Sequence, residues 1–410
     1  MKSICLIAQS VYDFDPRVRR KAEALAAVGY TVDVLALRPS DGRKSYTLNG
    51  VNVSTISIGK KRGSLARYLY EYVVFFAWAL VRVPLQMRKR HYAVVDVNTL
   101  PDFLVFAPVV ARWMGAKIIL DMHEITPEFY MSKYGIPAHS LLVRVLTYLE
   151  RISFNFADHV ITINEPILDL LISRGLAGAK ATVVMNAVDE ANFAVGSKAA
   201  APVGPAPDTF VMMYHGTLTR IYGLDLAIEA FAIAHGDMPG AEIWILGSGT
   251  EAGPLKALSQ KLGLEWKVKF VGQVPSTDIP GWLARCDLGL LPIRQDVFLD
   301  FAFPNKLPEF IIAGKAVLIS RLRTIRHYFS DAAVAFFKPN DPSDLATQMV
   351  RVFRDGTLRD RLVARAREEY APIRWDLMKQ RYLQVVDEAA GFGHRTADGS
   401  SAAETTALAR

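Results

Sequence analysis

Short apolar strands alternate with helix-like segments along most of this 410-residue chain, and that alternation restricts the fold more than any other feature. In the first half the pattern predicts strands at residues 4–8, 31–37, 51–58, 93–97, 117–120, 159–163 and 182–185, and helices at residues 18–28, 103–114 and 141–156. Strands that alternate with helices in this way form a parallel sheet with helices on both faces. The first half is therefore predicted to be a doubly wound α/β domain.

The pattern restarts after residues 194–208, where Gly, Ala, Pro and Ser predominate as in an interdomain linker. Predicted strands at residues 210–214, 241–246, 268–271, 288–291 and 316–320 then alternate with predicted helices at residues 223–235, 255–262, 279–286 and 306–313. Two doubly wound units create a cleft between two sets of strand ends, where a nucleotide and a second substrate fit. The tail after Gly391 is rich in Ala, Ser, Thr and Gly and is predicted to be disordered.

The positive charge of the chain is concentrated in the segment Lys60–Arg90. This segment holds eight Lys and Arg residues and one Glu, so its net charge equals the +7 of the whole chain. The rest of the chain is close to neutral, which argues against a nucleic-acid binder and favours one docking surface for an anionic partner.

An apolar run, Tyr72–Val81, lies inside this basic segment. Ten residues of helix span about 15 Å, half of a bilayer's hydrocarbon core, so a transmembrane helix is not expected. Arg82 and Pro84 follow the run. Two interpretations stay open: a helix buried in the domain, or a helix that contacts an anionic membrane surface.

Cysteine usage and the N-terminal residues indicate a reducing compartment. Cys5 and Cys286 are far apart, each in an apolar run, and are predicted to be buried free thiols. The first apolar stretch is too short for a signal peptide and reads as a buried strand, which predicts a cytoplasmic location. No metal-ligand spacing is present.

Two clusters of polar residues follow predicted strands in the first half. Asp15 precedes Pro16 and is expected to cap a helix that begins with Arg17, which explains this carboxylate better than a metal site shared with Asp13 does. Asp121, His123 and Glu124 follow the strand at 117–120, which suggests an acid/base or hydrogen-bonding site. The alternative is a histidine satisfied by its neighbours in a buried loop.

Small residues and cations follow the strands of the second half. Gly216, Thr217 and Arg220 come after the strand at 210–214, and Gly247 and Gly249 follow the next strand. Small residues let the backbone approach an anion, and an arginine offers a fork of donors to phosphate oxygens. This pattern predicts a phosphate site.

The segment Pro304–Glu309 is the strongest of these clusters. Lys306 is expected in the first turn of a helix, where a cation is unfavourable beside the helix dipole unless an anionic ligand binds there. Glu309, one turn later, is suited to accept both hydroxyls of a ribose.

Seven motifs stand in the order found in family 4 glycosyltransferases of the GT-B fold, and the resemblance extends over nearly the whole chain. They lie at residues 15–25, 121–128, 186–189, 215–218, 223–225, 287–292 and 309–317. The resemblance implies two Rossmann-like domains that face a cleft: an acceptor-side domain at 1–193 and a donor domain at 209–371. A helix within 372–390 would cross back onto the first domain.

The resemblance also implies the activity. It is the transfer of a sugar from a nucleotide diphosphate sugar with retention of anomeric configuration, an EC 2.4 reaction that needs no bound metal or other cofactor. With the basic segment, we expect a lipid-linked or polysaccharide acceptor and a peripheral position on the cytoplasmic face of the cell membrane.

The resemblance assigns roles to residues by position. His123 would contact the sugar or acceptor, Glu309 would hold the ribose, and Arg220 and Lys306 would stabilise the departing diphosphate. The full donor-binding set is Gly216, Thr217, Arg220, Gly247, Gly249, Asn305, Lys306, Leu307 and Glu309. The acceptor-side set is Asp15, Arg17, Asp121, His123 and Glu124.

Two positions depart from the family pattern. Tyr222 stands where many relatives have a lysine, and Phe301 stands where they have the first of two glutamates, with Asp300 one residue away as a substitute. These departures motivate an alternative, a non-catalytic subunit that binds a sugar nucleotide within a glycan assembly complex. A sugar-nucleotide epimerase is a third option, which the lipid-facing segment argues against.

Overall fold

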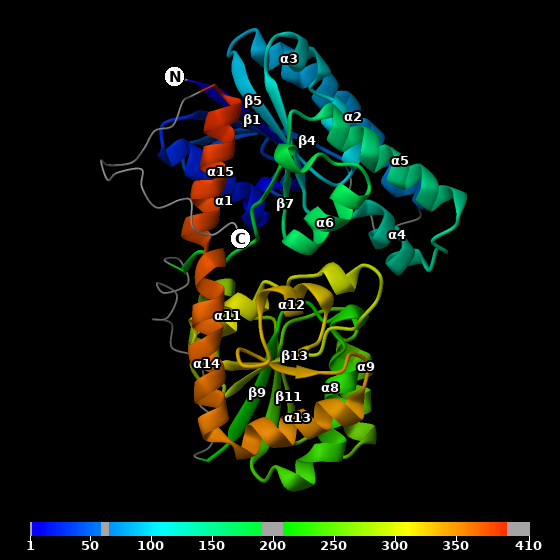
Figure 1. Ribbon diagram of the computed structural model, residues 1–410, viewed down its shortest axis with the longest axis vertical. Helices are drawn as coiled ribbons and strands as arrows, with labels where there is room; N and C mark the ends of the chain where they lie inside the picture. The colour runs from blue at the N-terminus through cyan, green and yellow to red at the C-terminus, as the bar shows by residue number, and fades with distance from the viewer. Residues whose placement is uncertain (1, 59–64, 191–207, 392–410) are drawn as a thin grey trace. The chain divides into compact units, whose positions relative to one another are not determined.

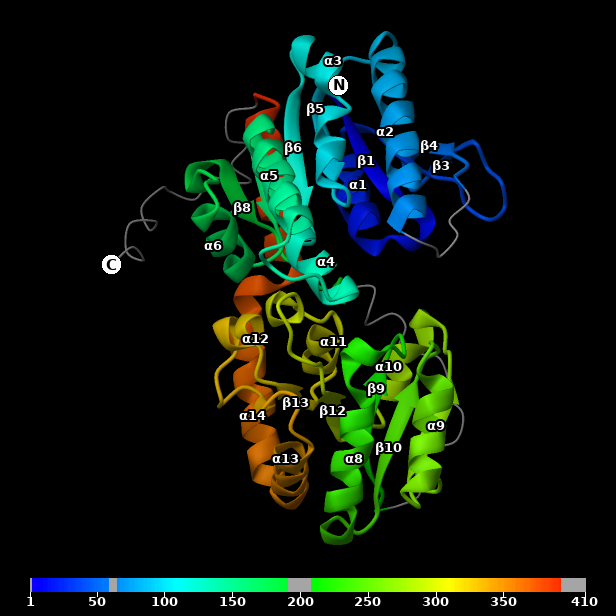
Figure 2. The same cartoon turned by 90° about the vertical axis from the view of Figure 1, so that its right-hand side faces the viewer.

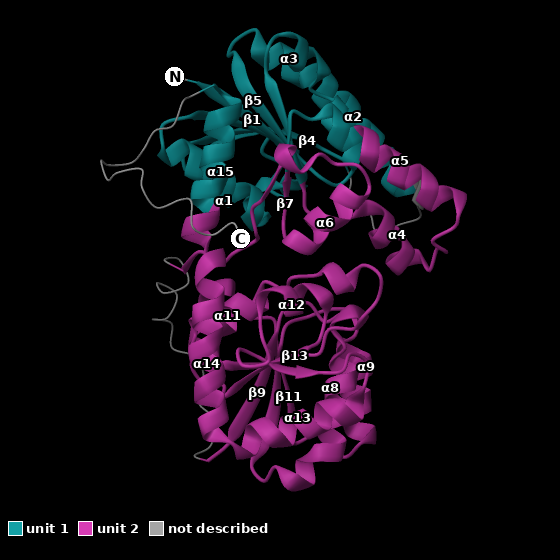
Figure 3. Cartoon of the chain, in the orientation of Figure 1, with its two compact units in different colours: residues 1–121, 153–160, 379–410 teal, residues 122–152, 161–378 magenta. Residues whose placement is uncertain are grey.

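The computed structural model describes residues 2–58, 65–190 and 208–391 (Figure 1). Residues 194–207 of the predicted linker and 392–410 of the predicted tail lie outside the described residues. The chain forms two compact units, residues 1–121, 153–160 and 379–410 in one and residues 122–152 and 161–378 in the other (Figure 3). The predicted domain limits at 193 and 209 stay predictions.

The first half contains an eight-stranded sheet. Its strands are β1 (Ser3–Val11), β2 (Thr31–Leu37), β3 (Ser45–Leu48), β4 (Val51–Ile56), β5 (Tyr92–Asn98), β6 (Lys117–Met122), β7 (His159–Thr162) and β8 (Ala181–Val183), in the order β3-β4-β2-β1-β5-β6-β7-β8. β3 and β4 pair antiparallel, whereas β4, β2, β1, β5 and β6 pair parallel. The antiparallel β3 was not predicted, because its short polar sequence lacks an apolar run.

The helices of the first half are α1 (Pro16–Ala27), α2 (Leu65–Met87), α3 (Val109–Trp113), α4 (Thr126–Tyr134), α5 (Leu141–Phe156) and α6 (Glu165–Ser173). The predicted cap of α1 is confirmed, because the Asp15 carboxylate accepts from the backbone N–H groups of Arg17 and Val18. The helix predicted at residues 103–114 was wrong as one element. A 3-10 helix, Asp102–Phe106, precedes α3, and Pro108 separates the two because it lacks a backbone N–H.

Helix α2 is longer than the apolar run Tyr72–Val81 suggested. It spans 23 residues, about 35 Å, and continues through Pro84, so the length argument against a membrane span was wrong. Its stretch Arg67–Met87 is long and apolar enough to cross a membrane by length and composition alone, which is weak evidence for a span. One face is buried at every fourth residue, with Phe75, Ala79 and Val83 fully covered.

The other face of α2 is exposed, so the helix is not wholly buried in the domain, and its contact with a membrane surface stays a prediction. Leu69, Tyr70, Val73, Val81 and Leu85 are each 45–60% exposed. Figure 2 shows α2 and α3 side by side. Helix α2 also contacts the 3-10 helix that precedes α3, where the centroids of the Phe76 and Phe103 rings lie 5.8 Å apart. Three cations of the basic segment, Lys60, Lys61 and Arg62, lie outside the described residues.

The second half contains a six-stranded sheet in which all strands pair parallel. Its strands are β9 (Phe210–His215), β10 (Ala241–Leu246), β11 (Val268–Gly272), β12 (Leu288–Leu291), β13 (Ala316–Ser320) and β14 (Ala335–Phe337), in the order β11-β10-β9-β12-β13-β14. β9, β12 and β13 are buried along their whole length, as expected for the centre of a parallel sheet.

Helices follow these strands and complete a second doubly wound fold. They are α8 (Leu224–Ala234), α9 (Ala252–Lys261), α10 (Ile279–Leu283), α11 (Lys306–Ile312), α12 (Arg323–Tyr328), α13 (Pro342–Arg354) and α14 (Gly356–Tyr370). The order of strands confirms the prediction of two Rossmann-like units.

The last helix, α15 (Trp375–Ala389), returns to the first compact unit. Residues from 379 onward belong to that unit. The Tyr382 hydroxyl donates to the buried Asp96 carboxylate of β5 at 2.7 Å, and the Tyr30 hydroxyl donates to Asp387. These contacts confirm that the final helix packs back on the first domain.

Candidate donor site

The candidate donor site lies at the carboxyl end of β9, where His215 ends the strand and Gly216 begins the loop. Gly216 has a φ of 127°, and a Cβ there would lie 2.3 Å from the Lys306 Cε atom. A larger residue here would displace the lysine side chain, and its backbone would be strained at this φ.

Lys306 is the first residue of α11, as predicted, and its ammonium group lies beside two aromatic rings. The Nζ atom is 4.2 Å from the centroid of the Tyr222 ring and 5.4 Å from that of Tyr214. Burial lowers the pKa of Lys306 to about 8, although the charge of Glu309 opposes this shift. A cation with so little water around it interacts strongly with an incoming anion.

His215 and Glu309 complete this cluster. The Nε2 atom of His215 lies 3.3 Å from a carboxylate oxygen of Glu309. Burial, and next the charge of Lys306, lower the pKa of His215 to about 3, so the imidazole is neutral near pH 7. The Glu309 side chain is 24% exposed and therefore stays within reach of a ligand.

Sequence reasoning treated Tyr222 only as a missing lysine. In the structure its ring lies 5.9 Å from that of Tyr214, and both rings face the ammonium group of Lys306. Cation–π attraction holds a lysine in place without neutralising its charge. The signal was present in the sequence, since Tyr214 and Tyr222 flank the loop that carries Gly216.

Other predicted donor residues make fewer contacts with this cluster. Arg220, Thr217 and Asn305 are exposed, and the Arg220 side chain makes no hydrogen bond or ion pair within the described part of the chain. Leu307 is fully buried and its N–H donates to the Pro304 carbonyl, so it offers a ligand neither side chain nor amide.

Gly247 and Gly249 allow two loops to pack together. A Cβ on Gly247 would lie 1.8 Å from the Gly216 carbonyl oxygen, and one on Gly249 would lie 2.1 Å from that of Leu218. The Leu218 N–H donates to the Ser248 carbonyl at 2.9 Å. Loop packing thus accounts for both glycines, and their contact with a phosphate stays a prediction.

Asp300, the suggested substitute for the missing glutamate, is engaged within the protein. Its Oδ1 atom accepts from the Arg323 backbone N–H at 2.9 Å and from the Gln295 side chain at 3.0 Å. These contacts fix the carboxylate at the start of α12, which weakens the case for a role in sugar recognition.

On the acceptor side, Asp121 at the end of β6 forms an ion pair with Lys21 of α1, and both side chains are buried. Burial lowers the pKa of Lys21 to about 8, and the charge of Asp96 opposes this shift. Sequence reasoning missed Lys21. The helical periodicity could have revealed that Lys21 is buried, because this lysine lies on the same face of α1 as the buried Val18 and Leu25.

The remaining acceptor-side residues lie in different surroundings. Asp15 caps α1, and Arg17 is partly exposed beside it. His123 is buried, Glu124 is partly exposed, and both follow the Asp121 ion pair by two to three residues. Within residues 2–58, 65–190 and 208–391 no group of three His, Cys, Asp or Glu residues is arranged to hold a metal ion. Cys5 and Cys286 are buried and free, as predicted.

Comparison with known families accounts for both halves of the chain. The model for "Glycosyltransferase Family 4" matches residues 17–192, and the model for "Glycosyl transferases group 1" matches residues 198–369. This chain belongs to glycosyltransferase family 4. The family assignment therefore supports the glycosyltransferase activity that the motifs predicted.

Sequence and structural relatives agree with this assignment. The glycosyltransferase is 24% identical to glycogen synthase of Mycobacterium tuberculosis over 293 residues, which is 68% of this chain and 69% of the relative. Its fold matches sucrose-phosphate synthase from Thermosynechococcus elongatus with a TM-score of 0.73 and 18% identity, over 95% and 99% of the two chains. The structure of HepE of Anabaena in complex with UDP matches with a TM-score of 0.71 and 17% sequence identity, over 95% of this chain and 100% of HepE. These structures show that the fold is GT-B.

Proposed function

We propose that this glycosyltransferase moves a sugar from a nucleoside diphosphate sugar to a lipid-linked or polysaccharide acceptor, with retention of anomeric configuration. The observation that carries the proposal is the cluster of Lys306, Glu309 and His215 at the carboxyl end of β9. A half-buried cation beside a partly exposed carboxylate suits a diphosphate next to a ribose. The complexes of HepE with UDP and UDP-glucose support this class of donor.

In the proposed reaction, the bond between the anomeric carbon and the diphosphate oxygen breaks as the acceptor oxygen bonds to that carbon. Negative charge then develops on the leaving diphosphate, and Lys306 stabilises it at a site where water screens little. The acceptor hydroxyl gives its proton to the departing phosphate oxygen. The positive charge in this proposal comes from Lys306, and no metal ion takes part.

Helix α2 supports a peripheral position at the cytoplasmic face of a membrane. Its exposed apolar face ends at Arg88 and Lys89, which are exposed and unpaired within the described residues. Two other cations of the basic segment form ion pairs within the chain, Arg67 with Glu71 and Arg90 with Asp33. Exposed apolar side chains next to free cations favour contact with anionic lipid.

The donor assignment is tested by thermal unfolding with UDP and GDP and with the matching nucleosides. The better diphosphate is expected to raise the Tm of the wild-type protein by roughly 2–4 °C near 100-fold saturation. In the wild-type protein, the nucleoside diphosphate should raise the Tm more than its nucleoside does. In Lys306→Ala, the two ligands should raise the Tm equally, by the amount that the nucleoside gives in the wild type. A variant that still distinguishes UDP from uridine would remove Lys306 from the site.

A non-catalytic sugar-nucleotide binder is the second candidate, and Phe301 and Tyr222 favour it because they replace two charged family residues. That protein would show the same ligand shifts without releasing nucleoside diphosphate from any donor. Turnover therefore separates the two candidates.

A further inference from the structure

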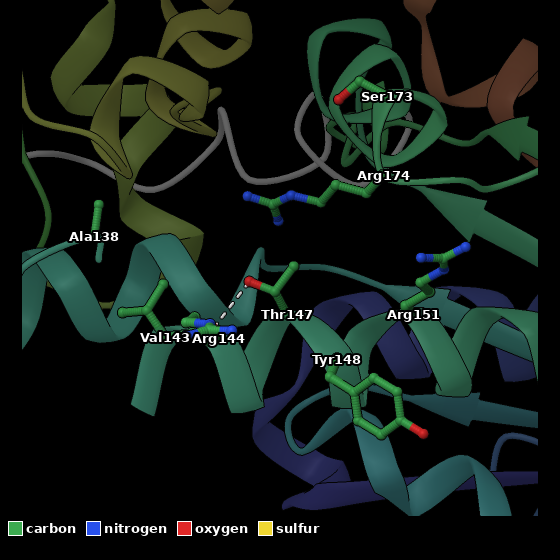
Figure 4. A pocket seen from close by; sticks show the side chains of 8 residues that line it. All are labelled: Ala138, Val143, Arg144, Thr147, Tyr148, Arg151, Ser173 and Arg174. Carbon is green, nitrogen blue, oxygen red and sulfur yellow. Dashed lines mark hydrogen bonds between the residues drawn. The ribbon is translucent and has the colours of Figure 1, made fainter. Parts of the chain in front are cut away.

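A pocket of about 500 Å³ lies between α5 and the end of α6, apart from the residues assigned to donor binding. Arg144, Thr147, Tyr148 and Arg151 line it from α5, and Ser173 and Arg174 line it from the end of α6 (Figure 4). Three arginines therefore border one opening, which is electrostatically costly unless counter-charges or an anion offset them.

One of these arginines is already neutralised. The Arg174 guanidinium donates to both carboxylate oxygens of Glu150, at 2.9 and 3.2 Å, and it also donates to Glu128. Both glutamates are buried, so these contacts fix the guanidinium at the wall of the pocket. This cluster explains why Glu128, which follows the predicted histidine loop, is buried.

The other two arginines have no such partners. Arg144 and Arg151 are exposed, and neither forms an ion pair or a side-chain hydrogen bond with any residue that the structure describes. They stand seven residues apart, two turns along one face of α5. A Cβ on Gly175 would lie 3.6 Å from the Arg151 Nε atom, so this side chain reaches the turn that follows Arg174.

The same face of α5 is apolar between its cations. Leu141 is 74% exposed, Val145 45% and Tyr148 64%, at the spacing of one helical stripe. Glu150 is the one acid between Lys133 and Asn155, and its side chain is fully buried against Arg174. The exposed surface of this segment is thus positive and apolar, with a tyrosine at its centre.

We propose that this pocket binds the phosphate group of an anionic membrane lipid, with Arg144 and Arg151 as its charged contacts. Guanidinium groups form paired hydrogen bonds with phosphate oxygens. The exposed leucine, valine and tyrosine beside them fit the boundary between head groups and acyl chains, whereas a soluble phosphate ligand would gain nothing from them. The proposal goes beyond the function given above, because this surface lies outside the basic segment Lys60–Arg90.

The experiment measures binding of the full-length protein to vesicles of phosphatidylcholine with and without phosphatidylglycerol. The Arg144→Gln/Arg151→Gln variant is compared with Arg326→Gln/Arg351→Gln, which removes the same charge from exposed positions on α12 and α13. We expect the α5 variant to bind the anionic vesicles roughly ten-fold or more weakly. The control variant should bind as the wild type does.

Three results would overturn the proposal. The first is unchanged vesicle binding by the α5 variant, and the second is an equal loss in the control variant, which would indicate a general charge effect. The third combines two observations: glycerol phosphate raises the Tm only when Arg144 and Arg151 are present, and vesicle binding does not depend on these arginines. That combination would assign the pocket to a soluble phosphate. The Tm of each variant without ligand reports misfolding, and UDP binding by the same variants reports failure of the donor site.

Discussion

At the scale of single residues, Lys306 has a positive charge with little water around it. Its neighbours are two tyrosine rings and one carboxylate, and a Cβ at Gly216 would occupy its space. The lysine therefore stays charged at neutral pH but releases its proton more readily than an exposed lysine does. That property gives the site a pH dependence.

The specificity constant for the donor is expected to fall at alkaline pH. Because the pKa of Lys306 is lowered to about 8, the ammonium form that attracts the diphosphate predominates below that pH and is lost above it. We predict that kcat/KM falls roughly ten-fold per pH unit above about 8.5 in the wild-type protein. In Lys306→Arg, which keeps its charge, this fall should be absent. A wild-type profile that stays flat to about pH 10 would contradict the assignment.

Residues at helix starts were easier to predict than residues whose partners lie far away in the chain. Asp15 and Lys306 stand at helix starts, where capping and the helix dipole give a physical reason for each residue type. Lys21 and Tyr222 acquire their roles from partners far away in the chain, Asp121 and Lys306. Such partners become visible only when the fold brings the elements together.

At the scale of elements, buried strands were the most predictable. Residues 31–37, 241–246, 288–291 and 316–320 form strands with the predicted bounds, because each is an apolar run that a parallel sheet buries. Helix α2 was harder, since Pro84 suggested an end that the structure does not have. The helix ends at Met87, so this proline lies in its last turn, where few of the hydrogen bonds of the helix remain to be disturbed.

Helix α2 is expected to contribute to membrane contact through its C-terminal end. We predict that Arg88→Gln/Lys89→Gln lowers binding to vesicles that contain phosphatidylglycerol by roughly 30-fold, because each of the two cations near an anionic surface contributes about 1 kcal/mol. Co-sedimentation of the full-length protein with vesicles measures this, with Arg326→Gln/Arg351→Gln as the charge-matched control. Normal binding by the α2 variant would contradict a role for this helix.

At the scale of the whole molecule, two doubly wound sheets follow one another along the chain, and α15 returns to the first unit. The order of strands in each sheet follows from the repeated alternation of strand and helix, which is why the fold class was predictable. The return of α15 was not derivable from local pattern. It depends on single long-range contacts, such as that of Tyr382 with Asp96, and was expected only from the family resemblance.

We propose that the cluster around Lys306 carries out glycosyl transfer from a nucleoside diphosphate sugar. The most direct measurement is release of UDP or GDP from their sugars by the purified protein, supplied with membrane lipid extract as acceptor. Lys306→Ala is compared with Lys315→Ala, whose lysine donates to the Ala284 carbonyl on the protein surface.

We expect release by the wild-type and Lys315→Ala proteins, and a rate lower by roughly 100-fold or more in Lys306→Ala. Equal rates in the two lysine variants would contradict the assigned site. Binding of UDP or GDP without release from any donor sugar would contradict the enzymatic role itself.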